Sequence, residues 1–332
     1  MSGQFTDLVE LFDSLPPPDQ NVGLGRFCAH LVPACPACSI GKDIDGCPAL
    51  LIGTDNAAPG PVHPLVLESF RVMHMVSCRV QERADSENER TLSVVQCTTR
   101  DRVTQEYFLR ALYPIIASLP ARPNREDVTR SVDRLLELFR QMSSAPRRAV
   151  SGLWAELFVI SEATSPEVML RSWRAIPEEK FDFSMSSDRV DVKSSAGTRV
   201  HYFNLDQLRP LPPLQAVVVS LLVERAQGGA NAIELVEVIR NRVHDSGLLL
   251  RLDQIVAETI GQDWRSLSEV RFSVDVARAS LRTINAGDIP SVSVPIPPEL
   301  SSVHFKVDLT AVAAGPCSVI PTASLFLALP TT

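Results

Sequence analysis

The chain has 332 residues, 45% of them hydrophobic and 21% charged, which is the composition of an ordinary soluble globular protein with a sizeable core. Its longest apolar run, residues 216–223, is far too short to cross a bilayer, so we expect a cytoplasmic protein with no membrane partner. The net charge of −7 does not favour nucleic-acid binding, but residues 140–210 hold ten Lys or Arg and nine Asp or Glu, so a DNA-binding surface there is not excluded.

The first part of the chain has the pattern of short strands followed by two helices. We expect strands at residues 49–53, 65–72, 75–80 and 91–97, with a hairpin loop at residues 81–90. Apolar residues at helical spacing predict helices at residues 105–118 and 126–141, and residues 142–146 are typical of a linker. We therefore predict an N-terminal α+β domain over residues 1–142, with a role in binding DNA or a partner protein.

Four cysteines in this first domain raise the question of a structural metal: Cys28, Cys35, Cys38 and Cys47. The two-residue spacing between Cys35 and Cys38 suits a zinc knuckle. The other spacings are irregular and no second such pair follows, so we favour buried, reduced thiols over a zinc site.

After Pro146 the pattern changes to a helix, several strands and a short helical turn. The helix is expected at residues 147–163 and the turn at residues 204–208. Strands are expected at residues 181–185, 189–194, 198–203 and 215–223. The remainder predicts helices at residues 231–243 and 252–261 and strands at residues 270–276 and 303–309. This order predicts a second domain over residues 147–332, of the α/β (α+β) class: a helix, a three-stranded meander, a short helix, a fourth strand and a mixed C-terminal extension.

Two acids on neighbouring predicted strands are the first candidate site residues. Side chains alternate along a strand, so Asp182 points away from its two flanking phenylalanines, and Asp191 shares one face with Lys193. A tight turn between the strands would bring Asp182 and Asp191 close together. Two such carboxylates repel each other unless a cation lies between them, and Mg²⁺ or Mn²⁺ prefers oxygen ligands. The pattern therefore indicates a phosphodiesterase site.

Lys193 and Glu156 complete the candidate set. Only four of the 32 basic residues are lysine, so a lysine two positions after Asp191 favours a specific role for an ammonium group. Glu156 lies on the flank of its predicted helix, from which it can reach the rim of the metal site. A single Asp-x-Lys is weak by itself, because strands often carry solvated acid–base pairs on a polar face.

Four segments together resemble the PD-(D/E)XK nuclease superfamily: Gly152-Leu-Trp-Ala-Glu156-Leu, Phe181-Asp182-Phe, Asp191-Val-Lys193-Ser-Ser and Leu205-Asp-Gln207-Leu. More closely, they resemble the bacterial PD-(D/E)XK motif proteins encoded in restriction and phage-defence gene clusters. The motif-bearing part covers residues 147–223. Three features depart from the usual pattern: no proline precedes Asp182, Ala155 replaces a common Gly, and Asp191 replaces the commoner Glu.

The resemblance implies a restriction-endonuclease-like core that cleaves DNA with Mg²⁺, for which Mn²⁺ substitutes. It implies catalytic roles for five residues: Glu156, Asp182, Asp191, Lys193 and Gln207. It implies metal binding by four positions: Asp182, Asp191, Val192 and Glu156. Other subunits of a defence system and a second copy of the chain are the implied protein partners. Because the superfamily contains members that have lost catalysis, a non-catalytic module that binds DNA or a partner stays open, as does an RNA-directed nuclease.

Several other polar residues are weaker candidates. Six arginines could line a DNA channel, although each alone is typical of a solvated surface: Arg147, Arg148, Arg171, Arg174, Arg199 and Arg209. His201 and His244 are isolated in the sequence, so we expect them to be core or surface histidines.

Overall fold

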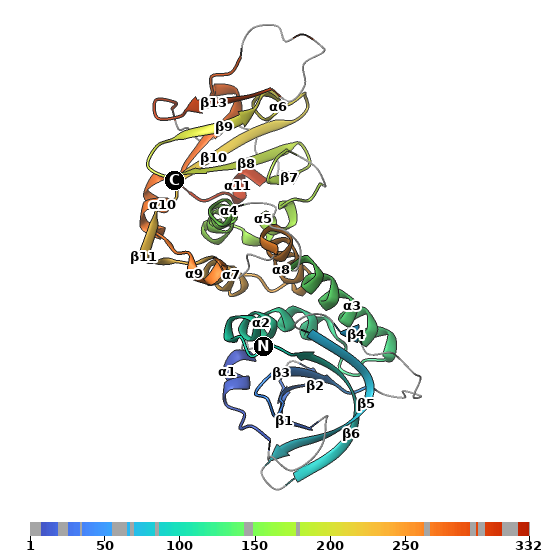
Figure 1. Cartoon of the computed structure of the whole chain (residues 1–332). Coiled ribbons are helices and arrows are strands. Elements are labelled where there is room, and N and C mark those ends of the chain that lie inside the picture. The colour runs from blue at the N-terminus through green and yellow to red at the C-terminus, as the bar shows by residue number, and fades with distance from the viewer. Residues whose placement is uncertain are drawn as a thin grey trace. The chain divides into compact units, whose positions relative to one another are not determined.

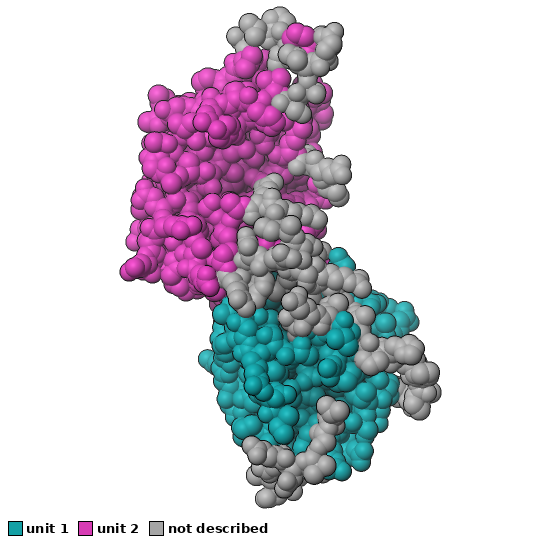
Figure 2. Space-filling model, viewed as in Figure 1, with its two compact units in different colours: residues 1–140 teal, residues 141–332 magenta. Residues whose placement is uncertain are grey.

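A computed structural model describes residues 8–18, 26–33, 35–54, 65–66, 70–83, 86–142, 149–176, 180–261, 266–292, 297, 303–313 and 325–331. The chain divides into two compact units, residues 1–140 and 141–332, coloured teal and magenta in Figure 2. The first unit is called the N-terminal unit below and the second the C-terminal unit. No described helix offers an apolar stretch of membrane-spanning length.

The N-terminal unit is built on a six-stranded sheet in the order β1-β2-β3-β6-β5-β4. Its strands are β1 (Arg26–Val32), β2 (Cys35–Lys42), β3 (Pro48–Ile52), β4 (Leu65–Val66), β5 (Phe70–Arg83) and β6 (Ser86–Cys97). Strand β1 also pairs in parallel with β5, so five of the strands close into a ring. Alternate side chains fill this ring with apolar groups such as Phe27, Leu51 and Val94.

Three helices belong to the same unit: α1 (Leu8–Asp13), α2 (Arg102–Ser118) and α3 (Arg125–Met142). Helix α2 begins where the Asp101 carboxylate accepts a hydrogen bond of 3.0 Å from the backbone N–H of Thr104. It buries Phe108 and Leu112 completely, and it contacts β2 and β3. The two helices predicted in this region are therefore confirmed.

The strands of this unit differ from the predicted ones in three places. The strands expected at residues 65–72 and 75–80 have the wrong bounds, because β4 covers only Leu65–Val66 and β5 continues from Phe70 to Arg83. Residues 81–90, expected as a hairpin loop, mostly continue the paired strands β5 and β6. Residues 88–90 of this segment are polar and exposed, so the sequence pattern resembles a loop. Strands β1 and β2 were not predicted, since their cysteines, proline and glycine obscure the alternation of apolar residues.

The four cysteines considered as a zinc site lie on β1, on β2 and just before β3, and all four are buried free thiols. The Cys47 thiol donates to the carbonyl oxygen of Thr99 at 3.5 Å, and the Cys35 thiol lies 4.0 Å from that of Pro120. Burial, followed by the charge of Asp43, raises the pKa of Cys47 to about 11. Burial also raises the pKa of Cys38 well above its usual value.

The C-terminal unit contains a four-stranded sheet in the order β12-β10-β8-β7. These strands are β7 (Phe183–Met185), β8 (Asp188–Ser195), β10 (Gln215–Leu222) and β12 (Arg282–Asn285). Strand β8 is internal, because it pairs antiparallel with β7 and parallel with β10. The middle of β10 is wholly apolar and completely buried, as expected for a strand covered on both faces.

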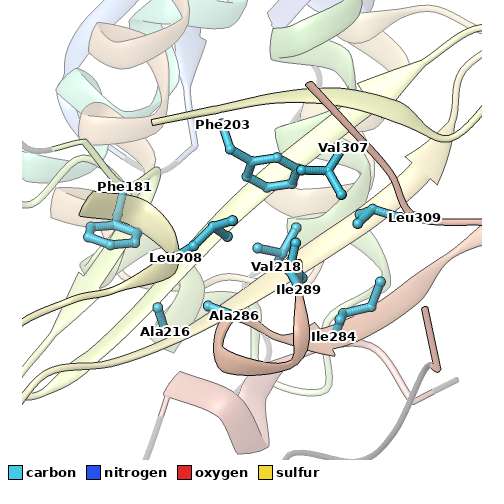
Figure 3. Close-up of a cluster of buried hydrophobic side chains, with 10 residues drawn as sticks. All are labelled: Phe181, Phe203, Leu208, Ala216, Val218, Ile284, Ala286, Ile289, Val307 and Leu309. Carbon is cyan, nitrogen blue, oxygen red and sulfur yellow. The ribbon is translucent and has the colours of Figure 1, made fainter. Parts of the chain in front are cut away.

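The predicted three-stranded meander is wrong in its third strand. Strand β9 (Val200–Asn204) forms, but it pairs with β13 (His304–Asp308) in a separate two-stranded sheet. The edge of β8 that a meander would need is already taken by β10, whose parallel pairing runs from Gln215 to Leu222. Between the two sheets lies a cluster of buried apolar side chains, in which Phe203 of β9 faces Val307 of β13 (Figure 3).

Helix α4 (Val150–Glu162) covers the opposite face of the four-stranded sheet and contacts β8 (Figure 1). The other helical segments are α5 (Pro166–Ser172), α6 (Leu205–Leu208), α7 (Ala232–Arg240), α8 (Ser246–Ile260), α9 (Ser266–Glu269), α10 (Val274–Ser280), η2 (Ala286–Asp288) and α11 (Leu325–Ala328). A strand expected at residues 270–276 is wrong, since α10 begins within this range at Val274, where the Ser273 side chain accepts a hydrogen bond from Val276 N. Strand β11 (Arg225–Ala230) and helix α5 were not predicted. The mixed α/β class is confirmed.

Candidate functional site

Strand β8 carries two of the predicted site residues on one face. Asp191 lies beside Val218 of β10, which belongs to the apolar cluster under β9. Val190 alternates with Asp191 and is therefore directed to the face that α4 covers. Asp191 is only 2% exposed, so its carboxylate is held in a largely dry environment. A buried charge of this kind requires partners, and the structure supplies them from β8 and α6.

Lys193 is the first of these partners. Its ammonium nitrogen lies 2.8 Å from Asp191 Oδ2. The same nitrogen is 3.4 Å from Gln207 Oε1 and 5.4 Å from the centre of the Phe203 ring. The Lys193 side chain is 19% exposed, so the charge of this pair meets solvent on the lysine side.

Gln207 connects the two charged residues to the neighbouring chain. It lies on α6, whose first turn is closed by a capping box with Asn204. Its Nε2 donates to Asp191 Oδ1 at 3.2 Å and to the Lys180 carbonyl at 2.6 Å. Its Oε1 accepts from Asn204 N at 3.1 Å. The Gln207 amide, which a short capped helix holds in place, therefore fixes the orientation of the Asp191 carboxylate.

Asp182 lies directly before β7 and contacts the same strand, β8. Its Oδ2 accepts a hydrogen bond of 2.8 Å from the backbone N–H of Val192, where a strand carbonyl would otherwise bind. Strands β7 and β8 pair Phe183 with Val190, and the same register continued by one residue sets Asp182 opposite Asp191. Directly opposed residues have Cβ atoms roughly 4.5–5.5 Å apart in antiparallel sheets. The predicted proximity of the two acids is thus explained by the turn between these strands.

Glu156 is placed differently from the other acids. It belongs to α4, is 2% exposed, and accepts a hydrogen bond of 2.6 Å from Trp173 Nε1. The Arg174 guanidinium donates to both of its carboxylate oxygens, at 2.9 and 3.2 Å. Its charge is therefore already balanced by Arg174. Neither Trp173 nor Arg174 was predicted in this role, because α5, which brings them there, leaves no clear periodicity in seven residues.

The other candidate arginines are scattered. Arg199, expected on a DNA channel, is 7% exposed and donates to the side chain and carbonyl of Ser220, at 2.9 and 3.2 Å. Arg171 and Arg209 are exposed, with partners Asp245 and Ser291. Arg147 and Arg148 lie outside the described residues.

His201 lies beside the site in a buried polar group. Its Nε2 is 2.8 Å from Ser220 Oγ, and Ser220 is the β10 neighbour of Lys193. Burial, followed by the charges of Lys193 and Arg199, lowers the pKa of His201 to about 4. A neutral histidine therefore lies next to the lysine at physiological pH.

The donor set of the site fits a hard divalent cation. Asp182 and Asp191 supply carboxylate oxygens from opposed positions of the β7–β8 register. Val192 has an apolar side chain, so its backbone carbonyl is the one oxygen that it can offer as a ligand. Glu156 does not complete a third ligand: within the described ranges, no three His, Cys, Asp or Glu side chains are grouped to hold one ion. The arrangement can therefore bind a cation mainly through two carboxylates, with Lys193 at its side.

Comparison with known sequences adds one finding. Residues 37–310 match the model of a family described as "Putative PD-(D/E)XK family member, (DUF4420)". No curated protein and no solved structure matches the chain.

Proposed function

Because this chain belongs to the PD-(D/E)XK family that its sequence matches over residues 37–310, we propose that its C-terminal unit is a Mg²⁺-dependent DNA endonuclease. Membership of this family indicates a nuclease-like fold, and the proposal starts from that fold. The observation that carries the proposal is the pairing of Asp191 with Lys193 at 2.8 Å, beside Asp182 on the adjoining strand. A strand that presents a buried acid and a partly exposed lysine two residues apart provides one metal ligand and one cation for a phosphate.

Each residue of the site has a distinct proposed task. Asp182 and Asp191 would hold the cation, with the Val192 carbonyl as a further oxygen. When bound, such a cation lowers the pKa of water and offsets charge on a phosphate. Lys193 would contribute its ammonium charge to the phosphate that reacts, and it reaches solvent on that side. Gln207 would keep Asp191 and Lys193 in place through one amide that contacts both.

The choice of DNA, and of restriction or phage defence as the setting, depends on the family resemblance of the motif segments. Other subunits of a defence system, or a second copy of the chain, are the proposed protein partners. An RNA substrate stays an alternative within the same chemistry. A non-catalytic module that binds DNA or a partner is the second candidate function, and the engagement of Glu156 by Trp173 and Arg174 favours it, since only two acids then remain for a metal.

Metal titration combined with cleavage separates these functions. We expect the wild-type chain to bind Mn²⁺ and to nick DNA, and Asp191→Asn to lose both properties, because the amide keeps the shape but removes the ligand charge. Asp206→Asn is the matched control, since Asp206 is an exposed acid of α6 paired with Lys180. Calorimetry gives the Mn²⁺ affinity, and plasmid relaxation gives cleavage. Wild-type protein that binds Mn²⁺ no better than Asp191→Asn would contradict the proposal and leave the non-catalytic module.

A further inference from the structure

Glu156 carries a buried negative charge that is already fully partnered. Trp173 Nε1 and the Arg174 guanidinium contact its carboxylate at 2.6 and 2.9 Å. The Arg174 guanidinium also donates to Thr259 Oγ1 on α8, which restricts it further. As a metal ligand, this carboxylate would have to share its oxygens between a divalent cation and the half-buried Arg174 guanidinium, and these two positive charges would repel each other.

The two partners of Glu156 hold the strand that carries Asp182. Trp173 forms an antiparallel bridge with Phe183, and their rings stack with centres 6.4 Å apart. The next residue, Arg174, donates its backbone N–H to the carbonyl of Asp182 at 2.8 Å. Asp182 is therefore held through its main chain by Arg174 and through its carboxylate by the N–H of Val192.

The backbone conformation of Arg174 indicates that these contacts hold the residue in one particular position. Its φ is +47°, in the left-handed region that residues other than glycine rarely adopt. Such a conformation persists only where surrounding contacts impose it, and residues held in this way tend to cluster at functional sites. Here the contacts are the side-chain bonds to Glu156 and Thr259 and the backbone bond to Asp182.

We propose that Glu156 is a positioning residue rather than a metal ligand. Together with Trp173 and Arg174 it forms a unit, called the Glu156 brace, that fixes Asp182 from the side away from Asp191. The metal-related part of this inference rests on the proposed function. The placement of Asp182 does not, so it can be measured by itself.

The most discriminating test compares substitutions of two tryptophans at helix α4: Trp173, which contacts Glu156 of this helix, and Trp154, which belongs to it. Trp173→Phe keeps a ring against Phe183 and removes the N–H that binds Glu156. Trp154→Phe is the matched control: Trp154 is a completely buried residue of α4 whose Nε1 donates to the Ala230 carbonyl at 3.0 Å, away from Asp182. Both variants lose one indole hydrogen bond. The bond to the Glu156 carboxylate is charge-assisted, so Trp173→Phe should lose more stability, and the exchange rates of the two variants are compared at matched global stability.

For Mn²⁺ affinity, measured by calorimetry, we expect Trp173→Phe to weaken binding by about 10- to 100-fold, the usual effect of removing a residue that orients a ligand. Trp154→Phe should bind Mn²⁺ normally. If Glu156 were itself a ligand, Trp173→Phe would free its carboxylate, and affinity would stay unchanged or rise. That result would overturn the proposal, and so would an equal loss in both variants.

Hydrogen exchange supplies a readout that needs no metal. The amides of Arg174 and Val192 donate to Asp182, so both should exchange faster in Trp173→Phe than in Trp154→Phe at matched global stability. Equal exchange in the two variants would refute the brace. If the wild-type protein binds no Mn²⁺, the proposed function is contradicted. The hydrogen-exchange rates would still show whether the Glu156 brace holds Asp182. If Trp173→Phe does not fold, Arg174→Lys, which keeps the charge but loses the forked donor, is judged by the same exchange criterion.

Discussion

Lys193 is the residue on which the proposed chemistry depends most directly. It shares a face of β8 with Asp191, and its side chain is partly exposed, whereas Val190 packs against the far side. The core therefore does not need the ammonium group. Its neighbours are oxygens of Asp191 and Gln207 and the face of Phe203, which together hold the charge in one place. A charge held in this way does not have to reorganise when a phosphate reacts.

We expect Lys193→Ala to reduce nucleic-acid cleavage by about a hundred- to a thousandfold, the usual loss for one preorganised charge. Mn²⁺ binding should be retained or strengthened, because Lys193 is a competing cation beside Asp191. Lys306→Ala is the control, since Lys306 lies over the exposed ring of Tyr202 on the outer β9–β13 sheet. Cleavage rates on plasmid DNA check the expectation, and near-normal cleavage by Lys193→Ala would rule the mechanism out.

At the scale of elements, the β9–β13 pair is attached to the four-stranded sheet partly by a buried histidine. His201 of β9 is 3% exposed and contacts Ser220 of β10, and Arg199 contacts the same serine. The His201 ring also lies edge-on to that of Phe203, with ring centres 6.4 Å apart, and Phe203 belongs to the apolar cluster drawn in Figure 3. Protonating His201 would place a third cation beside Lys193 and Arg199, so the attachment requires a neutral ring.

The low pKa of His201 predicts a pH dependence of stability. Its pKa is about 4 in the folded chain and 6.5 when unperturbed, so the unfolded state takes up a proton first as the pH falls. The stabilisation is complete above 6.5 and is lost progressively toward 4, with a slope of at most about 1.4 kcal/mol per pH unit. Urea unfolding at about pH 7 and about pH 5 should show a smaller decrease for His201→Gln than for wild type. Equal decreases would contradict the prediction.

The elements of the site were predictable where a regular pattern marked them. Strand alternation around Asp182 and Asp191 identified β7 and β8, and the amphipathic run before them identified α4. Pairing between distant strands was not predictable, because the sequence does not show that β10 takes the edge of β8. The partners of Glu156 were missed for a related reason: Trp173 and Arg174 follow a short helix, and only the fold brings them to α4.

At the scale of the whole molecule, the charge balance constrains how DNA could bind. The formal net charge is −7, so attraction to phosphate alone cannot provide strong binding. Several basic residues near the site also bind other residues of the protein: Arg174 binds Glu156, Arg199 binds Ser220, and Lys180 binds Asp206. A bound divalent cation would change the local balance by neutralising Asp182 and Asp191.

We therefore expect DNA affinity to depend on a divalent cation. Fluorescence anisotropy with a labelled duplex should show tighter binding in Ca²⁺, which supports binding without efficient cleavage, than in EDTA. Asp191→Asn should show little difference between the two conditions, because it lacks the ligand. Raising salt from about 50 to about 200 mM should weaken the Ca²⁺ complex only modestly, since several basic residues near the site are already bound to other residues of the protein. Equal affinity in Ca²⁺ and EDTA for the wild type would contradict this expectation.

The turn between β7 and β8 has only two residues, Ser186 and Ser187, and Ser186 adopts a φ of +49°. This turn sets which residues of the two strands face each other. One added or deleted codon here would shift the short strand β7 by one residue against β8, which its pairing with β10 holds in place, so Asp182 would no longer lie opposite Asp191. In a genetic screen, such a frame-preserving change would behave as a null allele although every residue of the site is still encoded.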